Sequence, residues 1–136
     1  HGVLTLRTAD ANNAFRATSR ESGAQLELFS LDEQPMARIL SDAVGGKFEL
    51  WNRSGATIIN AMCHQQGGAI QIADEFGNIR AESAVVETGA RLLLFDQEGF
   101  LSARVFNEDS TGGRLDLYEA IQSGEAPARS LFATNP

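Results

Sequence analysis

The chain is poor in several residue types that define functional classes. Its 136 residues include one cysteine, Cys63, two histidines and three prolines. One thiol cannot form an intrachain disulfide, and these few thiols and imidazoles cannot complete a tetrahedral zinc site. No apolar run approaches the roughly 18 residues of a membrane span. We therefore expect no disulfide framework, no zinc site and no membrane insertion.

Cationic residues are also scarce. Eleven lysines and arginines stand against eighteen acidic residues, which gives a formal net charge of −7. A surface of this sign repels phosphate backbones and anionic lipid headgroups. Nucleic acid and anionic membranes are therefore not expected as partners.

Catalytic patterns are missing as well. Cys63 and His64 are adjacent in the sequence, so alternation along a strand would point their side chains to opposite faces. A nucleophile and its base must instead lie within hydrogen-bond reach. Acidic residues such as Asp74 and Glu75 recur near the turns, but the glycine pairs lack the spacing of a calcium-binding β-roll. We expect no enzyme, no metal and no cofactor.

The chain is rich in repetition. One pattern of about 22 residues runs from Gly2 onward and leaves no room for a second domain, so residues 1–136 are expected to form one repeat domain. Its blocks are residues 2–23, 24–45, 46–67, 68–89, 90–112 and 113–136.

Each block begins with an alternating segment that is typical of a strand. The third position is always large and apolar, and its residues are Leu4, Leu26, Phe48, Ile70, Leu92 and Leu115. The fifth position follows the same rule, with Leu6, Leu28, Leu50, Ile72, Leu94 and Leu117. Because strand side chains alternate between faces, the two positions share one face, and we expect them to form ladders of a core.

A turn and a second strand follow the first strand. Position 10 is glycine in three blocks (Gly55, Gly77, Gly99), which suits a positive φ in a tight turn. Ala11 and Glu33 occupy this position in the first two blocks, so we expect those turns to be built differently. Position 14 is mostly alanine, which indicates close packing or a narrow solenoid turn. Glycine pairs such as Gly45–Gly46 then carry the chain into the next block.

Three packings satisfy this pattern. The blocks can form the coils of a β-solenoid, or an up-and-down antiparallel sheet of about twelve strands. Three chains can also pool their apolar faces about a common axis in a β-prism-like stack. The third segment of each block is almost wholly polar, so a single chain supplies few inward residues. This shortage favours a homo-oligomer, and a trimer over a dimer.

Aromatic residues recur one position after the second ladder. Position 6 holds Phe29, Trp51, Phe95 and Tyr118 in four blocks, on the face opposite the ladders. A row of rings on a nominally wet face indicates a self-association surface. Two alternatives remain open: the rings can close over a strand edge, or they can form a platform for a ligand such as a glycan.

Short β repeats punctuated by glycine resemble, in style, the shafts of viral and phage fibres and of trimeric surface adhesins. The resemblance covers the whole chain, and it implies a rigid structural element on a virion or cell surface. The sequence therefore predicts an all-β, non-enzymatic spacer or assembly module. The alternative is a carbohydrate-binding module that stacks sugar rings on Trp51 and the other aromatic residues.

Overall fold

A computed structural model describes residues 2–65, 67–87, 89–108 and 112–118 of the chain. They form eleven strands in one sheet. The strands are β1 (Gly2–Arg7), β2 (Asn13–Arg20), β3 (Gly23–Phe29), β4 (Pro35–Ser41), β5 (Gly46–Trp51), β6 (Thr57–His64), β7 (Gly67–Ala73), β8 (Ile79–Val86), β9 (Gly89–Phe95), β10 (Leu101–Glu108) and β11 (Gly112–Leu117).

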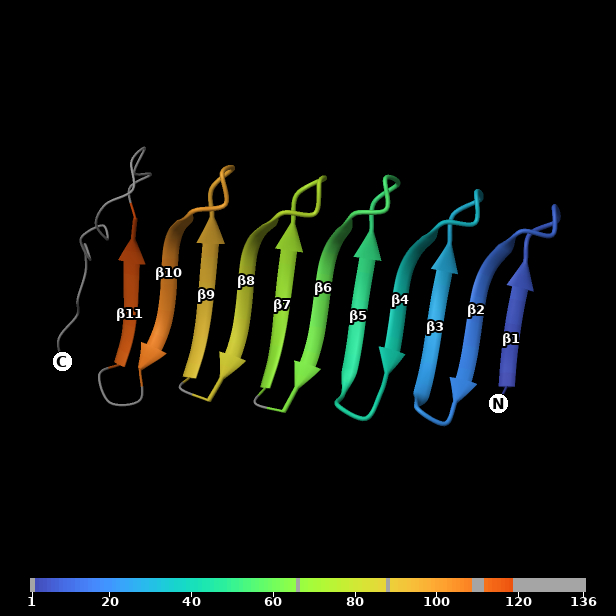
Figure 1. Ribbon diagram of the computed structural model, residues 1–136, viewed down its shortest axis with the longest axis horizontal. Coiled ribbons are helices and arrows are strands. Elements are labelled where there is room, and N and C mark those ends of the chain that lie inside the picture. The colour runs from blue at the N-terminus through green and yellow to red at the C-terminus, as the bar shows by residue number, and fades with distance from the viewer. Residues whose placement is uncertain (1, 66, 88, 109–111, 119–136) are drawn as a thin grey trace.

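The sheet has the simplest antiparallel order. Each strand pairs only with its neighbours in the sequence, from β1 at one end to β11 at the other (Figure 1). The all-β class and the hairpin repeat are confirmed, in the up-and-down form. A β-solenoid is not confirmed, because the neighbouring strands are antiparallel and lie side by side in one open sheet. The turn and second strand expected for block six fall outside the described residues.

The five turns that close the hairpins share one geometry. In the third hairpin, the amide of Gly55 donates to the carbonyl of Asn52, and the amide of Asn52 donates to the carbonyl of Ala56, both at 3.0 Å. Gly55 has a φ of 84°, and the strand register shifts beside the turn. This combination is a tight turn followed by a bulge with a left-handed residue.

The expectation of different turns in the first two blocks was wrong. Ala11 and Glu33 have φ values of 64° and 59°, and their amides make the same bonds as the turn glycines. The flanking strands already set the length and register of the hairpin, so they force these residues into the left-handed region despite the steric cost of a Cβ.

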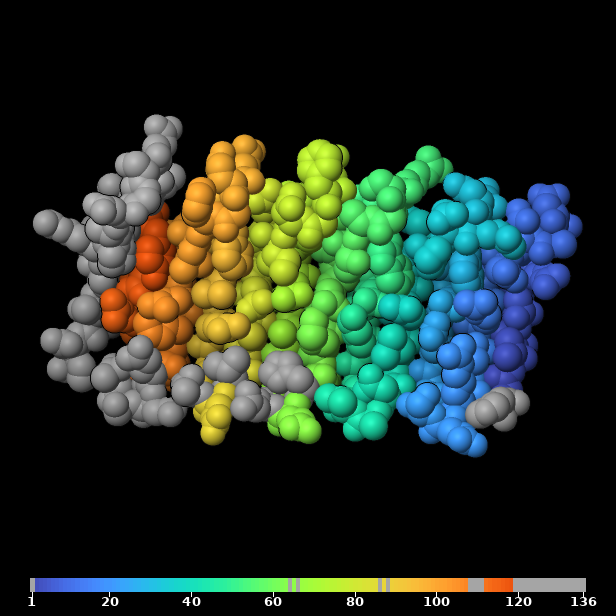
Figure 2. All heavy atoms as spheres, in the orientation of Figure 1, coloured from blue at the N-terminus to red at the C-terminus, as the bar shows by residue number. Residues whose placement is uncertain are grey.

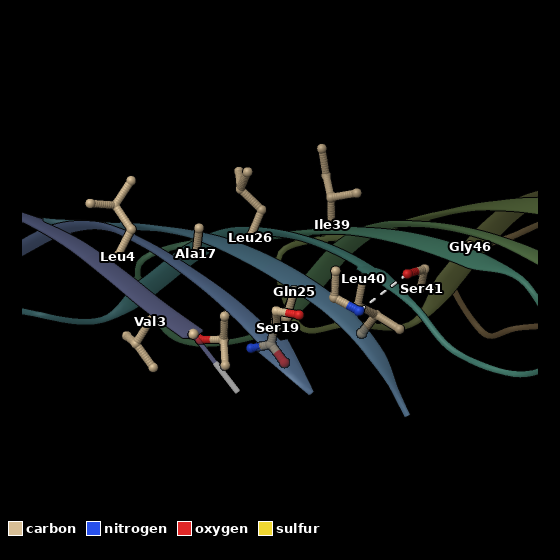
Figure 3. Close-up of a pocket in the computed structure, with 13 residues that line it drawn as sticks. Val3, Leu4, Ala17, Ser19, Gln25, Leu26, Ile39, Leu40, Ser41 and Gly46 are labelled. Atoms are coloured by element: carbon tan, nitrogen blue, oxygen red, sulfur yellow. Dashed lines mark hydrogen bonds between the residues drawn. The ribbon is translucent and has the colours of Figure 1, made fainter. Parts of the chain in front are cut away.

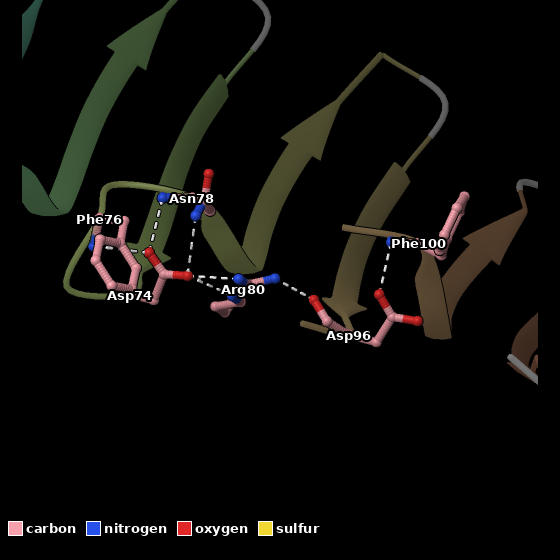
Figure 4. A network of polar contacts seen from close by, with 6 residues as sticks. All are labelled: Asp74, Phe76, Asn78, Arg80, Asp96 and Phe100. Carbon is pink, nitrogen blue, oxygen red and sulfur yellow. Dashed lines mark hydrogen bonds and ion pairs between the residues drawn. The ribbon is translucent and has the colours of Figure 1, made fainter. Parts of the chain in front are cut away.

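Side chains fasten the turns. In the second to fifth hairpins, the residue before the turn accepts a hydrogen bond from a backbone amide four residues later. Asp74 is the most heavily used, because it also accepts bonds from Phe76 and Arg80. Arg80 reaches on to the carbonyl of Asp96 in the next hairpin (Figure 4). Neighbouring turns are thus tied together.

Glycines at the opposite end of the sheet, where odd strands begin, allow close backbone approach. Gly23 has a φ of 139°, and a Cβ placed on it would lie 1.8 Å from the carbonyl oxygen of Ser41 on β4. Gly67 and Gly89 meet the neighbouring strand in the same way. Only glycine fits a left-handed position that is this crowded.

The sheet has no second layer in the described part of the chain. Consecutive hairpins follow one another across the visible face without any segment crossing over them (Figure 2). Among the described residues, Ala84 is the one buried hydrophobic side chain. Within the described residues the chain therefore lacks the enclosed core that a domain of this size normally builds from two packed layers.

Candidate functional site

The third and fifth positions of each block, which are large and apolar, line up from strand to strand across the whole sheet. With the facing residues of the even strands, they form two continuous rows on one face. Row A consists of Leu4, Ala17, Leu26, Ile39, Phe48, Ala61, Ile70, Ser83, Leu92, Val105 and Leu115. Row B consists of Leu6, Phe15, Leu28, Ala37, Leu50, Ile59, Ile72, Ala81, Leu94, Ala103 and Leu117.

These rows make one face of the sheet apolar and leave it uncovered. Leu4, Ala17, Leu26 and Ile39 stand on one side of the sheet, and Val3 points to the other (Figure 3). Leu4 keeps 58% of its surface exposed, and Ile70 in the middle of the sheet keeps 50%. The predicted ladders therefore exist, but the described chain does not cover them.

The area involved is large for a single chain. With strands about 4.8 Å apart and alternate side chains about 7 Å apart along each strand, rows A and B cover roughly 50 Å by 14 Å. That is about 700 Å², above the roughly 300–600 Å² of the largest apolar patch on an ordinary monomer. An apolar surface of this size indicates an interaction site.

Small residues border row A near the glycine junctions, where they leave two shallow hollows. A hollow of about 740 Å³ is lined by Gly2, Leu4, Ala24, Leu26 and Ser41, among others (Figure 3). A second, of about 520 Å³, lies further along and includes Phe48, Ala61, Cys63, Ile70 and Ser83. Alternation places Cys63 on the same face as Ala61.

The opposite face carries a polar row between rows A and B. Its members are Thr5, Arg16, Glu27, Arg38, Glu49, Asn60, Gln71, Glu82, Leu93, Arg104 and Asp116. Arg38 donates to Glu49 from a neighbouring strand, and Arg16 donates to Glu27 in the same way. Asn60 donates to Gln71 at 3.2 Å, and Gln71 donates to Glu82 at 2.8 Å. Side chains of neighbouring strands are thus bonded to one another along this row, although the Oδ1 atom of Asn60 is buried without a hydrogen-bond partner.

The acids of this row are more buried than the leucines behind them. Glu49 keeps 6% of its surface exposed and Asp116 keeps 4%. Burial acts to raise the pKa of Glu49, but hydrogen bonds and charge from Lys47 and Arg38 outweigh it and lower that pKa. For Asp116, the hydrogen bond from Arg104 lowers the pKa, and Arg114 adds to the effect against burial. These carboxylates stay ionised and paired.

The aromatic row lies on this polar face. Phe29 and Trp51 come from odd strands with an even strand between them, which places them roughly 10 Å apart. The guanidinium of Arg16 lies 5.3 Å from the ring centroid of Phe29, and that of Arg38 lies 5.2 Å from the ring centroid of Trp51. Both rings are half-buried. Arginine stacking therefore covers part of these two rings.

The other two predicted rings are also half-buried. Phe95 ends β9, and Tyr118 follows β11, where its amide donates to the carbonyl of Ser102 at 2.8 Å. Self-association through this aromatic row stays a prediction.

No site for catalysis or a metal emerges from the described residues. They include no group of three or more histidine, cysteine or acidic side chains able to hold a metal ion. No helix in the described part of the chain is long and apolar enough to cross a membrane. Cys63 is a free, exposed thiol.

No protein-family model matches the chain, and no curated protein matches it either.

The uncovered face was the feature that the repeat alone did not predict. One sequence signal for this face lies in the even strands. Their alanines pair with leucines of the neighbouring strands in the same row, and not with residues of a second layer. A second signal is the pairing of position 15, basic in Arg16, Arg38 and Arg104, with the acids at position 4. That match indicates a polar face whose charged side chains pair within the sheet.

Proposed function

We propose that the chain is a non-enzymatic structural module that acts through self-association. The observation that carries the proposal is the apolar face formed by rows A and B, which no described part of the chain covers. Assembly with further copies would remove this face from water at about 25 cal/mol per Å² of apolar surface. The chain would then serve as a rigid spacer or fibre-like element, in line with its resemblance to fibre shafts.

The proposal concerns the assembly surface and holds for more than one number of copies. Three sheets packed about a common axis would enclose a triangular, β-prism-like core with the polar rows outside, and this homotrimer is the assembly that the sequence favours. In such an assembly the polar faces, whose buried carboxylates pair with arginine and lysine, would remain in contact with water. A fibre-like role would place the protein on a virion or cell surface.

A matched pair of substitutions tests the assembly surface. Leu4 and Val3 are neighbours on β1, point to opposite faces and keep 58% and 67% of their surfaces exposed. Leu4→Asp would place a charge on the apolar face, and we expect it to weaken self-association at least tenfold. Val3→Asp adds the same charge to the polar face and should leave the association intact.

Light scattering after size exclusion gives the readout for both variants. A parent chain that remains a monomer of 14.6 kDa at high concentration would contradict the proposal. Equal loss of assembly in both variants would show that the apolar face is not the contact surface.

The second candidate function is carbohydrate binding by the aromatic row. It is supported by the position of Trp51 at the rim of the polar face, beside the charged side chain of Arg38. Aromatic faces stack on sugar rings, and nearby polar groups can fix their orientation. A glycan array probed with the parent chain and Trp51→Ala tests this function, and absent or unchanged binding would contradict it.

A further inference from the structure

The apolar face is corrugated with a period of two strands. Each odd strand places two large apolar side chains in rows A and B, such as Leu26 and Leu28 on β3. Each even strand places at least one small side chain there. The small residues of the even strands are Ala17, Ala37, Ala61, Ala81, Ser83 and Ala103. We call the odd strands ridges and the even strands furrows.

This relief is complementary to itself. Ridges and furrows both repeat about every 10 Å along the sheet, so a ridge of one copy fits a furrow of another when the two are shifted by one strand. Close-packed interfaces gain most of their dispersion energy from such interlocking, and ridge-on-ridge contact would leave voids over the furrows. A second copy of the chain is therefore the occupant that matches this face.

The symmetry of an assembly decides whether ridges can fit into furrows. Three copies about an axis that runs across the strands, in the direction of the strand order, place β1 beside β1 and ridge beside ridge. A twofold axis along the sheet does the same. A twofold axis parallel to the strands reverses the strand order of the second copy, so that a shift of one strand sets every ridge over a furrow.

We infer that two copies pack face to face about a twofold axis parallel to the strands, with β1 of each over β10 of the other. The inference rests on the proposed function and specifies its partner and geometry. This direction of shift covers β1, whose Leu4 and Leu6 are 58% and 56% exposed, rather than β11, whose Leu115 is 36% exposed.

The shift brings a large residue opposite a small one at six of the ten residue pairs between facing strands. Leu28 of one copy lies opposite Ala81 of the second, and Phe48 lies opposite Ala61. Ten facing strands span about 48 Å, and a band about 14 Å wide gives roughly 1,300 Å² over both copies. This area is within the roughly 1,200–2,000 Å² of specific, stable interfaces.

The first experiment is the solution mass of the parent chain. The pair predicts about 29 kDa, twice the 14.6 kDa of one copy. About 44 kDa would overturn the twofold pair and leave the proposed function standing as a trimer. A mass of 14.6 kDa at every concentration would overturn both.

The second experiment tests the register. Ala81→Leu fills a furrow and should weaken the pair at least tenfold, while the far-ultraviolet spectrum and the Trp51 fluorescence stay those of the parent. Leu28→Ala added to Ala81→Leu should restore the association, because the two residues meet only across the interface. Leu6→Ala is the matched control and should not restore it.

Each other outcome contradicts the inference. Unchanged association in Ala81→Leu would show that the furrow is not filled by a ridge. Restoration by Leu50→Ala instead of Leu28→Ala would show the opposite direction of shift. Equal restoration by Leu6→Ala would show that no defined register exists.

The single cysteine gives a third readout. Cys63 lies on β6, the middle strand, so the twofold axis brings the two thiols within about one strand spacing of each other along the sheet. Spin labels on Cys63 should show one short distance between two spins. Three coupled spins, or no distance within measurable range, would overturn the pair.

Discussion

Single residues in this sheet carry strain that the repeat does not need. Ala11 occupies the left-handed position that glycine fills in three other hairpins, with a φ of 64°. Its hydrogen bonds are the same as theirs, so the strain buys no additional contact within the turn. A block that lacks the turn glycine therefore identifies a position where a substitution to glycine should stabilise the folded chain.

Ala11→Gly should raise the free energy of unfolding. The substitution removes the left-handed penalty of about 1–2 kcal/mol for a residue with a Cβ, and the greater freedom of glycine in the unfolded chain offsets part of it. We expect a net gain of about 0.5–1 kcal/mol. Urea unfolding followed by Trp51 fluorescence measures the change, and Gly55→Ala should lower the midpoint. An unchanged or lower midpoint for Ala11→Gly would contradict the argument.

Asp74 should make the stability depend on pH in acid. Burial acts to raise its pKa, but hydrogen bonds from Asn78, Arg80 and Phe76 lower the pKa from 3.8 to about 2. The unfolded chain therefore binds the proton more readily than the folded chain. The stabilisation from Asp74 is complete well above pH 3.8 and is lost as the pH falls toward 2.

Asp74→Asn should accordingly flatten the stability profile between pH 5 and 2. The measurement is the urea midpoint of the parent and the variant across this range. Glu75→Gln, which changes an exposed carboxyl group in the same turn, is the control and should retain more of the parental slope. Parallel profiles for the parent and Asp74→Asn would rule out this role of Asp74.

At the scale of the strand, the polar row holds neighbouring elements in register. A slip of one residue would place leucines among the arginines, since side chains alternate between faces. Arg38 both pairs with Glu49 and stacks on Trp51, so it links β4 to β5 by two interactions.

Arg38→Ala should destabilise the chain by about 1–3 kcal/mol, because it removes a partner from a buried carboxylate. It should also shift the emission of Trp51, the sole tryptophan, to longer wavelength as the ring loses its cover. Arg53→Ala, in an exposed turn, is the control. An unshifted emission maximum for Arg38→Ala would show that the guanidinium does not shield the ring.

The strands and their order within a hairpin could be predicted from the sequence, because alternation and turn glycines are local signals. Leu50 and Ile72 were placed on one face for this reason, and the register confirms it. The absence of a second layer could not be predicted in this way. Whether a leucine is covered depends on distant chain segments or other copies, and alternation reports only which face it occupies.

At the scale of the whole molecule, each block interacts chiefly with the next one. Removal of residues 46–67 joins two glycine junctions and preserves the columns of the repeat. We expect a folded chain two strands shorter, with a modest loss of stability, because only nearest-neighbour contacts are removed. Circular dichroism and urea unfolding measure the result.

Removal of residues 46–56 is the matched control for this deletion. It takes out one strand and its turn, reverses the direction of every later strand and should disrupt the fold. Equal stability of the two shortened chains would show that strand direction and column order do not define the sheet.

The sequential strand order also determines how the molecule responds to force. β1 and β11 lie at opposite ends of the sheet (Figure 1). Tension applied between them acts along the inter-strand hydrogen bonds and not across them. The strand pairs carry this load in series, and the bonds within a pair open one after another, so the strands separate at low force. A single sheet of this order is therefore weak under tension between its end strands, and only contacts that span several hairpins at once would strengthen it.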